Sequence, residues 1–185
     1  MVNRCKWAES EDMLEYHDCE WGKPVHEDRL LFEFLILEGA QAGLSWSTIL
    51  KRREGYKKAF DNFDINKVAE YTKKDFDRLI IDEGIIGNKL KIRSTIENAK
   101  CFLKIQKEFG SFDKYLWGFV NNKVIDNGVK AMSEIPANTK LSDELSKDLK
   151  KRGFNFVGST ICYAFMQAIG MVNDHEVSCF RYKEV

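Results

Sequence analysis

Apolar residues recur along this chain at the three-to-four-residue spacing of helices, and strict alternation of apolar and polar residues is rare. Gly39, Gly153 and Gly170 lie where glycine commonly ends a helix. Residues 154–157 do alternate, but the run is short and isolated. The pattern therefore predicts an all-α fold, with helices over residues 30–37, 46–50, 66–71, 75–83, 92–105, 142–152 and 159–169.

A glycine turn separates two of these predicted helices. Residues 84–87 read Gly-Ile-Ile-Gly, and glycine permits the positive φ values that a tight turn needs. Gly84 and Gly87 therefore predict a helix-hairpin-helix element over about residues 75–105. The N–H groups at the start of its second helix can hold a DNA phosphate, with added charge from Lys89 and Lys91. The alternative is an ordinary αα-hairpin in the core.

A carboxylate and several aromatic rings point to a binding pocket. Glu38 and Trp46 flank a glycine-rich loop between two predicted helices, and Tyr16 and Trp7 supply further rings. Aromatic faces with one carboxylate suit a flat, electron-poor or cationic base. The alternative is that Trp46 belongs to the core and Glu38 is a surface acid at a helix end.

The same loop carries an apolar residue at its tip. Leu44 follows Gly43, and Ser45 is a suitable N-cap for the helix that begins at Trp46. An apolar side chain at a loop tip can fill the gap that a flipped nucleotide leaves in DNA. Leu44 as a wedge and Leu44 as an ordinary loop residue are both open.

Cysteine and histidine residues lie near both ends of the chain. Cys5 and His17 lie in the first twenty residues, and His175 and Cys179 in the last twelve. Two thiolates and two imidazoles are a complete set of ligands for a tetrahedral structural zinc. Cys19 is a competing ligand, and core cysteines with a surface histidine are the alternative to a metal site.

Composition narrows the class of protein. The length of 185 residues suits a single domain covering 1–185, and 44% apolar residues argue against a disordered chain. An odd number of cysteines and no apolar leader-like segment lead us to expect the reducing cytoplasm. A formal net charge of zero is unlike a dedicated non-specific DNA binder, although a local basic patch can serve the same purpose.

Taken in order, these segments resemble the bacterial DNA-3-methyladenine glycosylase I, or TAG-type, family over essentially the whole chain. So many matches in sequence order are far more specific than any single motif. The matching segments are residues 16–18, 20–22, 37–39, 41–46, 84–86, 117–121, 145–147, 151–154, 160–163 and 172–175.

The resemblance implies a helix-hairpin-helix glycosylase that excises 3-methyladenine from alkylated double-stranded DNA. It also implies one structural zinc that joins the two termini, and its ligands correspond to Cys5, His17, His175 and Cys179. We expect a monomeric bacterial enzyme with no membrane partner. No lysine is placed in the sequence to form a Schiff base, so we do not expect strand cleavage.

The resemblance also assigns roles within the pocket. Glu38 corresponds to the carboxylate that binds the base and serves catalysis, and Trp46 to the indole that stacks on it. Tyr16 and Trp7 correspond to further pocket residues. The loop around Gly43 and Leu44 corresponds to the segment that faces DNA.

Two departures bear on this assignment. The wider helix-hairpin-helix superfamily normally has an aspartate about twenty residues beyond the hairpin, and residues 102–107 contain none. TAG-type enzymes lack it too, which favours the narrower family. Some relatives have a tyrosine where this chain has Met13. A related glycosylase with another lesion preference is the closest enzymatic alternative, and Met13 is the residue that raises it. A non-catalytic DNA-binding module and a zinc-stabilised regulator are the alternatives from other classes of protein.

Overall fold

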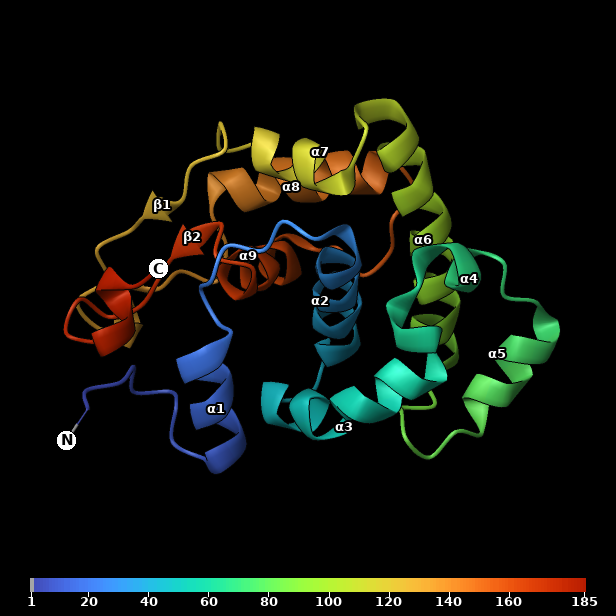
Figure 1. Cartoon of the computed structure of the whole chain (residues 1–185), viewed down its shortest axis with the longest axis horizontal. Coiled ribbons are helices and arrows are strands. Elements are labelled where there is room, and N and C mark those ends of the chain that lie inside the picture. The colour runs from blue at the N-terminus through green and yellow to red at the C-terminus, as the bar shows by residue number, and fades with distance from the viewer. Residues whose placement is uncertain (1) are drawn as a thin grey trace.

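Most of the chain is helical, as its apolar pattern predicts. The computed structural model describes residues 2–185, and Figure 1 shows their arrangement. The α-helices are α1 (Glu11–Cys19), α2 (Asp28–Gln41), α3 (Trp46–Ala59), α4 (Ile65–Ala69), α5 (Lys73–Ile80), α6 (Lys89–Phe109), α7 (Phe112–Gly118), α8 (Lys140–Lys151) and α9 (Ser159–Ala168). Short elements complete the order: η1 (Asp61–Phe63), β1 (Ile125–Asp126), η2 (Met132–Glu134), β2 (Val172–Asn173) and η3 (Phe180–Lys183).

Helix α2 lies at the centre of the molecule and contacts α3, α6, α7 and α9 (Figure 1). Every residue from 31 to 40 is buried, as expected for a helix with apolar residues all round. The predicted end at Gly39 is wrong, because α2 continues to Gln41. A Cβ on Gly39 would lie only 3.2 Å from Phe156 Cβ, so this glycine serves close packing inside the helix.

The prediction of an all-α fold needs one correction. Strands β1 and β2 pair in parallel, with Ile125 opposite Val172. Strands of two residues carry no alternating pattern that a sequence could reveal. Residues 154–157 form no strand, and Phe156 takes a positive φ of 55°. Helices α1 and α7, which the sequence analysis did not predict, complete the helical shell.

The hairpin differs from its prediction in the role of its glycines. Helix α5 ends at Ile80 and α6 begins at Lys89, but neither Gly84 nor Gly87 takes a positive φ. These glycines provide space instead. A Cβ on Gly87 would lie 2.8 Å from the Ile80 carbonyl oxygen, and one on Gly55 of α3 would lie 2.1 Å from the Gly84 oxygen. The hairpin therefore packs against α3 backbone to backbone.

We expect Gly55→Ala to lower the free energy of unfolding by about 3 kcal/mol or more, because the new methyl group collides with rigid backbone. Urea titration would measure the loss. Gly118→Ala is the matched control, since nothing lies within 4 Å of its Cβ position. A Gly55→Ala protein as stable as this control would contradict the close contact.

Within residues 2–185, none of the helices combines the length and apolar composition that a bilayer crossing requires.

Candidate functional site

Trp7, Tyr16, Glu38 and Trp46, the four predicted pocket residues, line one cavity of about 320 Å³. This volume is at the lower end of the range for small-molecule sites. Tyr16 comes from α1, Glu38 from the last turns of α2, and Trp46 from the first turn of α3. The remaining lining residues are Met13, Trp21, Gln41, Met132, Ile135, Ala164 and Gln167.

Aromatic rings form the walls of this cavity. The ring centroids of Tyr16 and Trp46 lie 5.4 Å apart at 51°, and those of Trp7 and Trp21 lie 4.9 Å apart, edge to face. The predicted N-cap holds Trp46 in place, because the Ser45 side chain accepts a hydrogen bond from the Thr48 N–H. Tilted rings of this kind leave faces on which a flat ligand can stack.

Glu38 places a carboxyl group in the wall of the cavity, where only 4% of the residue is exposed. Among residues 2–185, no group forms a hydrogen bond with this side chain. Burial raises the pKa of Glu38 to about 8. Burial and the neighbouring Glu38 carboxylate likewise raise the pKa of Tyr16 well above its usual value. At neutral pH Glu38 and Tyr16 in the cavity wall are therefore mostly uncharged.

Glu38→Gln should stabilise the protein increasingly as the pH rises. The folded state holds the Glu38 proton more tightly than the unfolded state, whose pKa stays near 4.5. Ionisation therefore weakens the native protein between pH 4.5 and pH 8, and the uncharged Gln avoids this loss. We expect the stability difference to grow by about 4 kcal/mol across this window, measured by urea titration. Glu15→Gln, an exposed change on α1, is the control for the substitution itself.

The indole N–H of Trp46 is buried and has no hydrogen-bond partner among residues 2–185. A buried donor without an acceptor is costly, so this position is less stable than a paired one. The cavity itself combines aromatic stacking surfaces with one carboxyl group.

The loop between α2 and α3 lies open to solvent. Gly43 takes a positive φ of 79°, and Leu44 at the tip is 41% exposed. Lys91 joins this loop to the hairpin, because its ammonium group donates hydrogen bonds to the Ala40 and Ala42 carbonyl oxygens at 2.7 and 2.6 Å. Two of its three donors therefore stabilise the end of α2, a role that the sequence analysis did not foresee.

The start of α6 is also partly occupied. The Asn88 side chain caps the helix and accepts hydrogen bonds from the N–H groups of Leu90 and Lys91. Lys89 is exposed at the first position of the helix. The contact with phosphate that we predicted for Gly84, Gly87, Lys89 and Lys91 stays a prediction.

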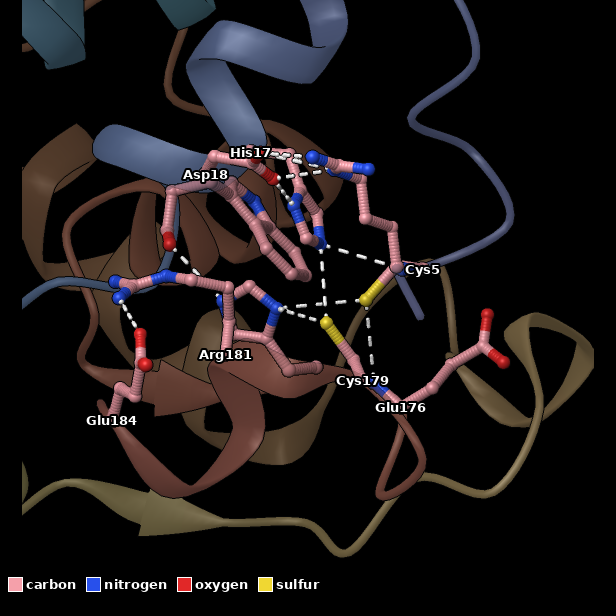
Figure 2. Close-up of polar contacts among 10 residues, drawn as sticks. Cys5, His17, Asp18, Glu176, Cys179, Arg181 and Glu184 are labelled. Atoms are coloured by element: carbon pink, nitrogen blue, oxygen red, sulfur yellow. Dashed lines mark hydrogen bonds and ion pairs between the residues drawn. The ribbon is translucent and has the colours of Figure 1, made fainter. Parts of the chain in front are cut away.

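The two termini meet in a cluster of four buried side chains, namely Cys5, His17, His175 and Cys179 (Figure 2). Their ligand atoms all lie within 4.8 Å of one another. Cys179 Sγ lies 3.4 Å from His17 Nε2, and Cys5 Sγ lies 3.5 Å from His175 Nδ1. Cys19 is exposed and lies outside the cluster, so the competing ligand set is not formed.

These separations fit a tetrahedral metal. A zinc ion bound by sulfur at about 2.3 Å and nitrogen at about 2.0 Å brings neighbouring ligand atoms to about 3.5 Å from each other. Burial lowers the pKa of His175 to about 4, which keeps its imidazole in the neutral form that binds metals. The cluster could therefore hold one metal ion with all four positions filled by the protein.

A second layer orients both imidazoles, as is usual around metal ligands. His17 Nδ1 lies 2.8 Å from the Asp18 carboxylate, which in turn binds Arg4 (Figure 2). His175 Nε2 donates to the Trp21 carbonyl oxygen at 3.1 Å. These contacts leave His17 Nε2 and His175 Nδ1 facing the two sulfur atoms.

Sequence reasoning missed several residues of the cavity. Trp21 follows the predicted ligand His17 by four positions, and its indole was a signal that we did not use. Met132, Ile135 and Gln167 carry no comparable signal, because they approach the cavity only through tertiary folding. Met13, which we singled out as a departure from some relatives, does line the cavity.

Comparison with known proteins agrees with this geometry. A family model described as methyladenine glycosylase matches residues 7–182. DNA-3-methyladenine glycosylase 1 of Escherichia coli (strain K12) is 48% identical over 182 residues, which cover 98% of this chain and 97% of that protein. DNA-3-methyladenine glycosylase of Haemophilus influenzae (strain ATCC 51907 / DSM 11121 / KW20 / Rd) is 46% identical over 180 residues, or 97% of each chain.

A solved structure gives the same result. One solved structure, of 3-methyladenine DNA glycosylase I (TAG) from Staphylococcus aureus, addresses how that protein recognises 3-methyladenine. It matches this chain with a TM-score of 0.93 at 38% identity. The match covers 97% of this chain and 96% of that one. Both the sequence and the structure therefore show that this chain belongs to the methyladenine glycosylase family.

Proposed function

We propose that this protein is a DNA-3-methyladenine glycosylase, which removes 3-methyladenine from alkylated DNA by hydrolysing the N-glycosidic bond. The observation that carries the proposal is the aromatic cavity with the buried Glu38 carboxyl group in its wall. The named relatives, at 48% and 46% identity over nearly the whole chain, support the same activity.

The chemistry suits this cavity. 3-Methyladenine in DNA carries a delocalised positive charge, and the base departs neutral, so strong help from a general acid is unnecessary. Trp46 stacks on the base. The positive charge of the entering base lowers the pKa of Glu38, and the resulting carboxylate accepts hydrogen bonds from the base. Tyr16 and Trp7 enclose the base, and water attacks the anomeric carbon.

Strand cleavage is not part of the proposed reaction. None of the described residues that line the cavity is a lysine, so the cavity offers no amine for a Schiff base. We therefore propose a monofunctional glycosylase without lyase activity.

We propose that DNA approaches over the loop and the hairpin, which Lys91 links. Leu44 is exposed at the loop tip, where an apolar side chain can fill the gap left by the flipped nucleotide. Gly43 allows the left-handed turn behind it. Lys89 and the Gly87 N–H group would hold a phosphate of the backbone, because the N–H groups of residues 84–86 already donate to Asp82 and Tyr56.

We propose that the terminal cluster holds one structural zinc ion. Cys5, His17, His175 and Cys179 provide the ligand types and separations that zinc requires. Zinc there would hold the N-terminal segment, which carries Trp7 and Tyr16, against the rest of the cavity. A monomeric cytoplasmic enzyme completes the proposal, and the two named relatives are bacterial.

The decisive experiment measures free bases released from methylated duplex DNA, separated by chromatography. We expect release of 3-methyladenine without release of 7-methylguanine. A folded protein that binds DNA but releases no base would instead be a DNA-binding module, and release of other bases would indicate a glycosylase with a different lesion preference.

A further inference from the structure

A buried carboxylate outside the cavity holds one of its wall residues. Asp174 is 1% exposed, and its Oδ2 atom accepts a hydrogen bond from Gln167 Nε2 at 2.7 Å. The same carboxylate accepts hydrogen bonds from the Tyr163 hydroxyl at 2.6 Å and from Asn127 Nδ2 at 2.6 Å. Three donors in a buried position fix the place of this carboxylate.

This contact determines which way the Gln167 carboxamide faces. A carboxylate only accepts hydrogen bonds, so the amide must turn its NH₂ group toward Asp174 and its oxygen away. Asp174 does not line the aromatic cavity, but lines a second cavity of about 250 Å³ together with Tyr163 and Asn127. Gln167 lines the aromatic cavity, as does Ala164 one helical turn before it on α9. The amide oxygen is therefore the end of the side chain that Asp174 leaves free.

Gln41 shows that this arrangement is specific. It lines the same cavity, but among residues 2–185 its carboxamide has no hydrogen-bond partner. Its NH₂ group and its oxygen can exchange places at little cost. Gln167 cannot do so, because an amide oxygen against the Asp174 carboxylate would be repelled.

We propose that Asp174 is a positioning residue that fixes the Gln167 carboxamide, so that its oxygen accepts a hydrogen bond from the amino group of the bound purine. An amino group carries two hydrogens, one for Glu38 and one for Gln167. A purine with a keto oxygen at the same carbon would place an acceptor against the Gln167 oxygen, which cannot donate, and would be rejected. Gln167 is thereby a determinant of specificity, an inference that rests on the proposed function.

The test compares two free bases that differ at one carbon. 3-Methyladenine has an amino group where 3-methylhypoxanthine has a keto oxygen, and both should quench the fluorescence of the tryptophans in the cavity. In Gln167→Met we expect the Kd for 3-methyladenine to rise about fivefold and the Kd for 3-methylhypoxanthine to stay or fall. Equal weakening of both bases would overturn the proposal, since a general packing defect acts on both alike.

The role of Asp174 is tested by a double-mutant cycle. Asp174→Asn should weaken the preference for 3-methyladenine over 3-methylhypoxanthine, as Gln167→Met does. The reason is that an Asn side chain can pair with either end of the Gln167 amide. Adding Gln167→Met to it should then cause no further loss. Additive losses would show that the two residues act independently and would overturn the positioning role. Tyr163→Phe removes another hydrogen bond to the same carboxylate oxygen and, as the matched control, should keep the preference.

Asp174 precedes His175 of the terminal cluster, so a measurement on the unaltered protein complements the variants. We expect the side-chain NH₂ of Gln167 to exchange with solvent much more slowly than that of Gln41 in NMR spectra. Similar exchange at the two residues would overturn the positioning role. A wild-type protein that releases no 3-methyladenine would refute the proposed function itself, whereas release with an unchanged preference in Gln167→Met would refute only this inference.

Discussion

Glu38→Gln should slow the release of 3-methyladenine from methylated DNA by about a hundredfold or more. In the proposed reaction the cationic base draws the Glu38 carboxyl group into its ionised form, and the uncharged Gln cannot provide that stabilisation as the glycosidic bond breaks. The change keeps the size of a side chain that is 4% exposed, so the cavity should keep its shape. Single-turnover release on methylated duplex DNA gives the rate.

The affinity for DNA should change little in the same variant, because the proposed contacts with the backbone lie on the loop and the hairpin. Glu15→Gln on α1, which is exposed, should keep the wild-type rate. Equal losses in DNA affinity and in base release would contradict the role assigned to Glu38.

Cys179→Ser should lower the melting temperature by about 10 °C or more and abolish binding of the proposed zinc ion. A structural zinc contributes directly to folding, and a few kcal/mol correspond to such a shift in a protein of this size. The fraction of the protein that remains folded should still release the base, since the cluster lies outside the cavity. Calorimetry gives the melting temperature, and metal analysis gives the zinc content.

Cys19→Ser is the matched control for this experiment. Cys19 is exposed and lies two positions beyond His17, but it takes no part in the cluster. Its replacement should leave the melting temperature and the metal content unchanged. A Cys179→Ser protein with the same two values as wild type would rule out a metal at this site.

The sequence carried most of the helical architecture because periodicity is a local signal. The apolar run around residues 30–37 predicted α2. Ser45 predicted the start of α3, because an N-cap contact joins residues only three positions apart, here Ser45 and Thr48. The end of α2 was wrong because Gly39 is explained by its contact with Phe156, a residue far along the chain. A glycine that avoids a distant collision looks the same in sequence as one that ends a helix.

In the candidate site, too, residues with a distinctive type were predicted correctly, and contacts that depend on the fold were not. Cys5, His17, His175 and Cys179 were identified because their residue types are rare and chemically distinctive, and the structure brings them together. Lys91 was expected to face DNA, yet two of its hydrogen bonds go to carbonyl groups of α2. A lysine with a backbone partner cannot be told from a free one without coordinates.

The Gln167–Asp174 pair could not have been read from the chain either. A glutamine near the end of an apolar helix carries no chemical signal by itself. The orientation of its side-chain amide depends on one hydrogen bond of 2.7 Å to the buried Asp174 carboxylate, which lies outside that helix.

The terminal cluster also bears on the order of events during synthesis. Cys5 and His175 are 170 residues apart, so they can meet only after His175 has left the ribosome. Trp7 and Tyr16 are synthesised long before His175 and Cys179, so the segment that carries them stays without these two partners until late in translation. A chain that stops before His175 therefore lacks half of the cluster.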